Sequence, residues 1–443
     1  MKTAFLFSRD LRLQDNEALS YAAKTSSELL PVFQIPENFD SLSAIRQHSL
    51  IESLKSLSES LPQGLEVTRD LKSVLLSFGI ERVVATKLYD TSGLIAQAEL
   101  AELLFPLGIP LELKGSNYAI APGSVTKDDG TGVKVYTPFY KRWMNHGWVK
   151  PFALSPEDVN WLKPTSLRLP QANENAPFKI RAGEKYALVT WERFKRDRLN
   201  GYAEARNRMD LGGTSHLSHA LAHGEIHPRT LLLELGDSED EDVFRKELAW
   251  REFYADVMFR NPHTLGDYYE PRFAGMRYAD PVKDGELLEA WKQGRTGYPV
   301  VDAAMRQLNS TGWMHNRARM IVASFLVKDL HFEWQVGARY FEQQLTDFDP
   351  ASNSHGWQWT AGCGTDASPY YRVFNPVTQG EKFDPNGDYV RKFVPELGHI
   401  DGSRVHQPWD LIDGYVNGYP LRVVDHASER DESLRRLEEI KTQ

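Results

Sequence analysis

Three tryptophans stand close to an acid-rich loop in the C-terminal half of this 443-residue chain. Trp334, Trp357 and Trp359 flank residues 345–353, and seven of the 11 tryptophans fall within residues 250–409. That concentration exceeds what packing requires, because a buried indole N–H needs a partner. The region could hold an aromatic cofactor, donate electrons to it and stack a nucleobase.

Two carboxylates in the loop, Asp347 and Asp349, could accept hydrogen bonds from a ribose or a ring N–H. One of them could also pair with Arg319. Together with Asn353 they resemble the start of a calcium-binding loop, but the central glycine and the distal glutamate are missing. The sequence therefore predicts no metal site.

Two segments with helical spacing could contact a nucleotide. Glu247, Trp250 and Arg251 share one helix face, where they could read, stack on and neutralise it. Asn316 and Met320 lie one helical turn apart and could contact a planar group. The alternatives are that Trp250 and Met320 fill the core of the protein.

A glycine pair precedes hydroxyl-rich residues at 212–218. Backbone and hydroxyl donors there could receive a phosphate at the start of a helix. The simpler alternative is that Thr214 or Ser215 only caps that helix.

Apolar runs of strand length alternate with amphipathic segments in the first part of the chain, which predicts a doubly wound parallel α/β sheet. No glycine fingerprint follows the first run, so a dinucleotide site of the Rossmann type is not expected. We expect strands at 3–7, 29–33, 65–68, 82–86 and 111–113, and helices at 42–61 and 94–105.

The fold expected for the whole chain is α/β plus all-α. We expect an α/β domain at 1–125, a long interdomain linker at 126–200 in which prolines interrupt any periodicity, and an all-helical domain at 201–443. The charged segment after Ala427 predicts a solvated terminal helix.

Bulk composition excludes several classes of protein. The mean hydropathy of -0.48 argues against a membrane protein, and a single cysteine cannot form a disulfide framework. The net charge of -9 excludes a surface that is basic throughout, although a local basic surface could still bind nucleic acid. We expect a cytoplasmic monomer.

Several long motifs follow one another along the chain: FSRDLRLQDN at 7–16, TGYPVVDAAMRQL at 296–308 and FNPVTQGEKFD at 374–384. With the residues above, they resemble the photolyase/cryptochrome flavoprotein family, most closely the class I cyclobutane pyrimidine dimer (CPD) DNA photolyases. The resemblance covers nearly the whole chain. It implies an N-terminal antenna domain, a helical FAD-binding domain and a bacterial-type protein that associates with the nucleoid when bound to DNA.

The resemblance implies that FAD is the cofactor and that it is active as FADH⁻. His216 stands where the family usually has arginine, and Asn353 resembles the amide that faces the flavin N5 atom. The residues implied to bind the cofactor are Tyr202, Thr214, Ser215, His216, Leu217, Ser218, Arg319, Asp347, Phe348, Asp349 and Asn353.

The implied partner is UV-damaged DNA containing pyrimidine dimers, which photolyases flip out of the duplex. Trp250 and Trp359 resemble the two indoles that sandwich the dimer, and four arginines resemble phosphate clamps, which predicts salt-sensitive affinity. The residues implied to contact DNA or the lesion are Glu247, Trp250, Arg251, Asn316, Arg317, Met320, Trp359, Arg206 and Arg372.

The implied activity is that of a carbon–carbon lyase: photoexcited FADH⁻ donates an electron to the dimer, the ring splits and the electron returns. Photoreduction of the flavin normally uses three tryptophans, and Trp357 and Trp334 match the inner and middle ones. The outer one has no match, and we hypothesise that Tyr278 or a different indole ends the chain. Asn353 and Glu247 complete the residues implied to take part in the chemistry.

The antenna chromophore stays open between methenyltetrahydrofolate, 8-hydroxy-deazaflavin and none, because residues 88–91 read Leu-Tyr-Asp-Thr where folate-binding members often have a Tyr-Glu pair. Two alternative functions are a cryptochrome-type blue-light photoreceptor without repair activity and a (6-4) photolyase. Met320 stands where a (6-4) photolyase would have histidine, and a cryptochrome of the DASH type usually has tyrosine in place of Trp359.

Overall fold

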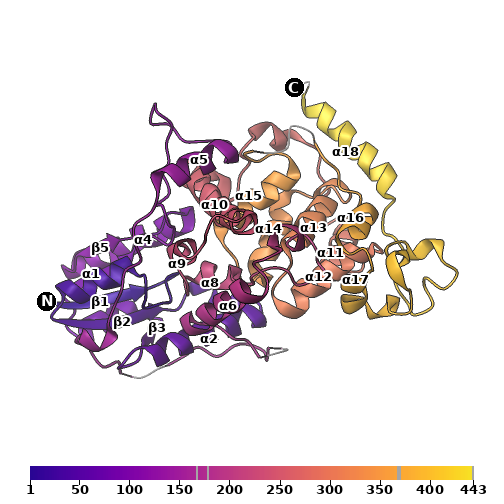
Figure 1. The fold of residues 1–443 in the computed structure, drawn as a ribbon. Coiled ribbons are helices and arrows are strands. Elements are labelled where there is room, and N and C mark those ends of the chain that lie inside the picture. The colour runs from indigo at the N-terminus through magenta and orange to yellow at the C-terminus, as the bar shows by residue number, and fades with distance from the viewer. Residues whose placement is uncertain (166–167, 177–178, 367–370, 442–443) are drawn as a thin grey trace. The chain divides into compact units, whose positions relative to one another are not determined.

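The computed structural model describes residues 1–165, 168–176, 179–366 and 371–441, which form two compact units (Figure 1). Unit 1 comprises Met1–Asn200, Ser215–Pro262 and Asp349–Ala351, and unit 2 comprises Gly201–Thr214, His263–Phe348 and Ser352–Gln443. These units are interleaved in sequence, unlike the predicted domains. The predicted limits at residues 125 and 200 stay predictions.

Unit 1 contains a five-stranded parallel sheet in the order β3-β2-β1-β4-β5. All five strands fall on the predicted apolar runs, because a parallel sheet covered on both faces needs nearly continuous apolar sequence. Their bounds are β1 (Lys2–Phe7), β2 (Glu28–Gln34), β3 (Glu66–Thr68), β4 (Arg82–Thr86) and β5 (Leu111–Lys114).

Two apolar clusters cover the two faces of the sheet. Alternate strand residues such as Phe5 and Leu6 enter different clusters, as the twofold repeat of a strand requires. The helices of unit 1 are α1 (Glu17–Thr25), α2 (Ala44–Ser60), α3 (Leu71–Ser77), α4 (Thr91–Leu104), α5 (Tyr136–His146), α6 (Glu184–Asp197), α8 (Ser218–His223), α9 (Pro228–Leu233) and α10 (Glu239–Arg260).

The predicted linker at 126–200 is only partly extended. It contains α5 and α6, which sequence reasoning missed because proline was taken to break helices. Pro138 lies in the first turn of α5, where its missing N–H removes no helical hydrogen bond.

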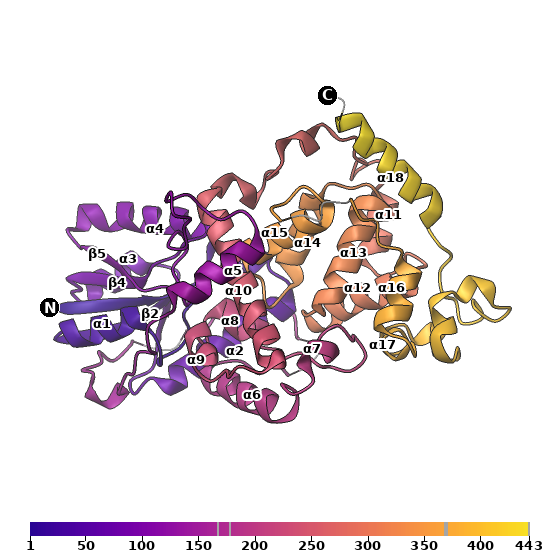
Figure 2. The same cartoon turned by 45° about the horizontal axis from the view of Figure 1, so that its top comes forward.

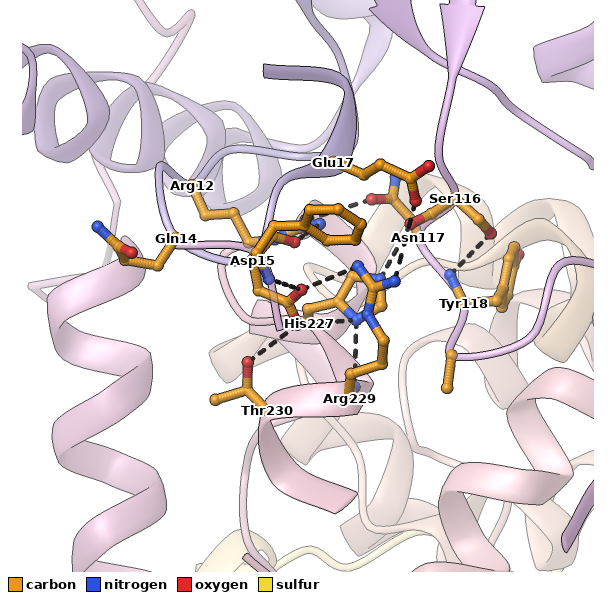
Figure 3. A network of polar contacts seen from close by, with 12 residues as sticks. Arg12, Gln14, Asp15, Glu17, Ser116, Asn117, Tyr118, His227, Arg229 and Thr230 are labelled. Carbon is orange, nitrogen blue, oxygen red and sulfur yellow. Dashed lines mark hydrogen bonds and ion pairs between the residues drawn. The ribbon is translucent and has the colours of Figure 1, made fainter. Parts of the chain in front are cut away.

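A buried polar network holds the loop after β1 to residues 224–230 (Figure 3). The guanidinium of Arg12 donates to the carbonyl of Gly224 at 2.9 Å, and that of Arg229 donates to Asp15 at 2.8 Å. The ring of His227 accepts from the Arg229 N–H and contacts the carbonyl of Ser116 at 2.9 Å. Burial and the two guanidinium groups lower the pKa of His227, so its imidazole is neutral.

The described residues of unit 2 form helices joined by loops and include no strand, as predicted for this half of the chain, and Figure 2 shows these helices from a second direction. Its central helix α12 (Pro299–Thr311) packs against α11, α13, α16 and α17. The remaining helices are α7 (Tyr202–Ala205), α11 (Gly285–Lys292), α13 (Asn316–Lys328), α14 (Trp334–Gln344), α15 (Pro350–Ala361), α16 (Pro376–Phe383), α17 (Asp388–Phe393) and α18 (His426–Lys441).

The terminal helix α18 is solvated on one side only. Leu437 and Ile440 are buried in the core of unit 2, and Glu429 contacts the His331 ring at 2.7 Å. The expected terminal helix is therefore present and is docked. Within the described ranges, no helix has the length and apolar content needed to cross a membrane.

Candidate functional site

Asp347 carries a buried carboxyl group with one oxygen paired and the other without a partner among the described residues. Arg319 donates to the carbonyl of Met314 at 2.9 Å and to Oδ2 of Asp347 at 2.6 Å. The Asp347 side chain is 1% exposed, and its Oδ1 has no hydrogen-bond partner among the described residues. The predicted pairing with Arg319 is confirmed, and one oxygen is left to accept from a ligand.

A second buried acceptor of unit 2 lies at the end of residues 201–214. The hydroxyl of Thr214 is buried and has no partner within the described parts of the chain. Tyr202, the first residue of α7, is buried on the same segment. Because an unpaired buried hydroxyl costs free energy, this group also fits a ligand.

The amide of Asn353 on α15 has a fixed orientation. Its Nδ2 donates to the carbonyl of Ala338 on α14 at 3.1 Å, so the oxygen is the end of the amide directed away from that carbonyl. Phe348, another predicted site residue, is half-buried at the end of the loop.

An aromatic row runs through unit 2. Trp357 lies against α14 at Gly337, where an added Cβ would come within 2.1 Å of the indole. Trp334 lies one turn before Gly337 on the same helix, and the N–H groups of both indoles are buried with no partner among the described residues. Trp334 therefore belongs to the helix against which Trp357 packs.

Beyond Trp334 the row continues through tyrosines. The ring of Tyr268 meets Trp334 edge-on, with centroids 6.3 Å apart, and stacks on Tyr278 at 6.4 Å. Sequence reasoning proposed Tyr278 but missed Tyr268, which links it to Trp334. It also missed Trp291, whose ring centroid is 6.2 Å from that of Trp357.

The glycine-rich segment does not form the predicted N-cap. Helix α8 begins at Ser218, and its N-cap Leu217 makes no side-chain hydrogen bond. The hydroxyl of Ser215 accepts from the Leu217 N–H at 3.3 Å, and His216 adopts a left-handed φ of 56°. Neither Thr214 nor Ser215 caps α8, because the helix starts later than the hydroxyl residues indicated.

Helix α10 of unit 1 begins with a capping box of Ser238 and Glu241. It carries three of the residues predicted to contact DNA or the lesion: Glu247, Trp250 and Arg251. Trp250 is half-buried and stacks on Tyr136, with centroids 3.7 Å apart and planes inclined by 5°. Glu247, one turn before Arg251, is also half-buried.

Arg251, one of the predicted phosphate clamps, makes several internal contacts. Its guanidinium donates to the carbonyls of Asn117 and Leu221, lies over the Tyr118 ring and approaches Asp349 at 4.0 Å. These contacts hold α10 in unit 1. The contact of Arg251 with DNA stays a prediction.

The remaining predicted contacts lie in unit 2 with different exposure. Arg317 donates to Asn207 at 2.6 Å, whereas Arg372 is exposed and lines a cavity of about 440 Å³ together with Arg430. Arg206 lies over the Tyr202 ring, Asn316 is exposed, Met320 is half-buried, and the Trp359 N–H donates to the carbonyl of Asp366.

Comparison with known proteins accounts for this combination of groups. Residues 3–157 match the model of DNA photolyase, and residues 244–439 match that of the FAD binding domain of DNA photolyase. A deoxyribodipyrimidine photo-lyase of Vibrio cholerae is 36% identical over 97% of this chain and 97% of its own.

Two solved structures are similar over the whole length. A bacterial class III photolyase from Agrobacterium tumefaciens superposes with a TM-score of 0.87 at 34% identity, covering 100% of this chain and 98% of its own. A cryptochrome from Synechocystis sp. PCC6803 also gives 0.87, at 28% identity, covering 98% and 99%. The narrower class I assignment stays a prediction. The buried acceptors, the aromatic row and these full-length similarities together show that the chain belongs to the DNA photolyase family.

Proposed function

We propose that this protein is a deoxyribodipyrimidine photo-lyase that splits cyclobutane pyrimidine dimers in DNA under light. The observation that carries the proposal is the 36% identity over 97% of the chain to a photo-lyase. Other relatives that are 34–35% identical over 97% of the chain are also named deoxyribodipyrimidine photo-lyase, which favours repair over a photoreceptor function. The lesion residue Met320 further disfavours a (6-4) photolyase.

Unit 2 supplies acceptors and a cation that fit FAD. The unpaired Oδ1 of Asp347 and the hydroxyl of Thr214 can accept from ring or ribose donors, and Arg319 holds the Asp347 carboxyl group in place. When bound, reduced FAD supplies a light-driven electron to the dimer and takes it back after the ring has split. Tyr202 and Phe348 are the further cofactor contacts proposed within unit 2. The family resemblance alone supports the proposed contacts Ser215, His216, Leu217, Ser218 and Asp349.

Asn353 is suited to the reduced form of the cofactor. Because its Nδ2 is held by the Ala338 carbonyl, its Oδ1 is the atom available to a ligand. An amide oxygen accepts but cannot donate, so it favours a ligand nitrogen that carries hydrogen. If Asn353 faces the flavin N5 atom, as the resemblance implies, its oxygen would accept from N5 in the forms in which that atom carries hydrogen.

Two indoles are proposed to recognise the lesion: Trp250 of unit 1 and Trp359 of unit 2. Trp250 is supported by its Tyr136 stack, and Trp359 by its N–H bond to Asp366, so both rings keep fixed planes. A fixed aromatic plane stacks on an extruded base at little entropic cost. Glu247, Asn316 and Met320 are proposed to contact the bases, and Arg206, Arg317 and Arg372 the phosphates.

Two further predictions rest on the sequence. The protein is proposed to act as a monomer, and the sheet domain is proposed to hold an antenna of the folate or deazaflavin type. Asp90 is not assigned to the antenna, because it caps α4 through the Gly93 N–H and pairs with Arg9.

The test uses purified, chemically reduced protein and a thymine-dimer oligonucleotide under near-UV light. Recovery of thymine absorbance in the light, with none in the dark, is the expected result. The absence of recovery from a flavin-loaded protein would reject repair in favour of a photoreceptor.

A further inference from the structure

Tyr268 lies between the tryptophans of unit 2 and Tyr278. Its ring meets Trp334 at an interplanar angle of 87° and stacks on Tyr278 at 21°. It is 4% exposed, so the phenol does not exchange freely with water. An oxidised Trp334 therefore has Tyr268 as an oxidisable neighbour in ring contact.

The hydroxyl of Tyr268 donates to Oε1 of Glu333 at 2.9 Å. Glu333 is the N-cap residue of α14 and directly precedes Trp334, so the indole and the carboxylate are fixed by the same helix end. The side chain of Glu333 is only half-buried, which gives its carboxylate access to solvent. This distance is within the reach that proton transfer to a base requires.

The other tyrosines along the aromatic row have no base on their hydroxyl groups. Tyr278 donates to the carbonyl of Phe273 at 3.0 Å, and Tyr340, whose ring contacts Trp291, donates to the Asn309 amide oxygen at 2.7 Å. Carbonyl and amide oxygens do not take up a proton near neutral pH. The contact with Glu333 therefore distinguishes Tyr268 chemically from its neighbours.

The resting state of this pair is a neutral phenol beside a carboxylate. Burial is the main cause that raises the pKa of Tyr268, and the negative charge of Glu333 adds to it. A phenol that loses an electron becomes a strong acid, so its oxidation must release the hydroxyl proton. The nearest acceptor is the carboxylate that already holds it.

We propose that Tyr268 and Glu333 form a proton-coupled relay that re-reduces Trp334 during light-driven reduction of the cofactor, an inference that rests on the proposed function. The oxidant is the indole radical cation of Trp334, formed when the row gives up an electron to a photoexcited oxidised flavin. One electron passes from Tyr268 to Trp334 while the phenol O–H bond breaks and the proton moves to Glu333. The products are a neutral indole, a neutral tyrosyl radical and a carboxylic acid.

The proton transfer has a consequence for the lifetime of the separated charges. Return of the electron to Tyr268 requires return of the proton as well. Glu333 can release that proton to solvent, and the proton is then not available to the tyrosyl radical when the electron returns. The relay thus slows recombination and gives an external reductant time to act.

The experiment compares flavin-loaded wild-type protein with Tyr268→Phe, Glu333→Gln and Tyr340→Phe. Tyr340→Phe is the matched control, because it removes the hydroxyl of a half-buried tyrosine whose ring contacts Trp291 of the same row. Flash photolysis follows the tryptophan radical, and electron paramagnetic resonance at low temperature identifies the tyrosyl radical. Flavin content and thermal unfolding of each variant are measured in parallel.

The expected wild-type result is decay of the tryptophan radical into a tyrosyl radical, slower in D₂O than in H₂O. Tyr268→Phe loses the tyrosyl signal, whereas Glu333→Gln keeps the hydrogen bond but slows the decay. Tyr340→Phe behaves as wild type. A tyrosyl signal that persists in Tyr268→Phe, or a Glu333→Gln decay equal to that of the wild type, would overturn the relay.

The same measurements separate this inference from the proposed function. If the flavin-loaded wild type forms no tryptophan radical on illumination and repairs no dimers, the proposed function fails and the relay fails with it. If repair and the tryptophan radical are present but no tyrosyl radical follows, only the relay is wrong. Loss of the signal in Tyr278→Phe with retention in Tyr268→Phe would instead identify Tyr278 as the donor.

Discussion

Replacing Arg319 by methionine tests the buried carboxylate on which cofactor binding depends. The change leaves Asp347, 1% exposed, with neither oxygen paired by a cation. Removing one partner of a fully buried pair costs about 3–5 kcal/mol, and because Arg319 is 25% exposed, we expect a smaller cost of about 2–4 kcal/mol. The same change should weaken flavin binding, because the orientation of Asp347 is lost.

The loss of flavin affinity follows from the hydrogen bond to a charged group. Such a bond contributes about 1.5–3 kcal/mol, which corresponds to about 10- to 150-fold in the dissociation constant. Urea unfolding of the flavin-free protein measures the stability term, and flavin fluorescence titration measures the binding term. The two terms are obtained separately, since only the second involves the cofactor.

Arg306 provides the matched control within unit 2. It also donates through Nε to a main-chain carbonyl, and its carboxylate partner Glu396 lies 2.8 Å away but is 27% exposed. Because water can solvate Glu396, Arg306→Met should cost no more than about 1 kcal/mol and leave flavin binding unchanged. Equal costs for the Arg306 and Arg319 variants, with equal flavin affinities, would refute the reasoning.

Three further outcomes are expected. Burial lowers the pKa of His355 from 6.5 to about 4, so its neutral form contributes about 3 kcal/mol of stability that is present above pH 6.5 and lost as pH falls through 4. In His355→Gln, the thermal unfolding midpoint should fall less between pH 6.5 and pH 4 than it does in the wild type. An equal fall in the two proteins would contradict this. Gly337→Ala should destabilise the protein by about 1–3 kcal/mol and shift the fluorescence of Trp357, because the added methyl overlaps the indole. Tyr136→Leu should weaken binding of a dimer-containing oligonucleotide by about 2- to 10-fold, because the stack that orients Trp250 contributes about 0.5–1.5 kcal/mol, whereas binding of undamaged DNA measured by anisotropy should not change.

The sheet could be predicted almost residue by residue because its central strands β1, β2 and β4 are buried apolar runs. The helices at 136–146 and 184–197 were missed although both are amphipathic, because Pro138 and the prolines between the two helices were taken as breaks. In these segments the tertiary contacts decide the structure. Tyr136, for example, is fixed by its stack on Trp250, which lies more than 100 residues later in the chain.

The candidate site divides in a similar way. The pairing of Arg319 with Asp347 could be anticipated from charge, and the two tryptophans from their motif. The internal role of Arg251 could not, because its partners Asn117 and Leu221 contribute main-chain carbonyls that no sequence pattern marks. Tyr268 was missed because its contact with Trp334 joins residues that are distant in sequence. Glu333, which immediately precedes Trp334, could have indicated a buried hydroxyl partner near that indole.

The polar network around Arg12 has a consequence for biosynthesis. Arg12 and its acceptor Gly224 are 212 residues apart, and an added Cβ at Gly224 would come within 2.0 Å of the Arg9 carbonyl. At about 5–20 residues per second, a ribosome needs about 10–40 s to make the intervening chain. During that interval Arg12 and Asp15 lack their later partners Gly224 and Arg229, so chaperone depletion or slower elongation should lower the yield of native protein.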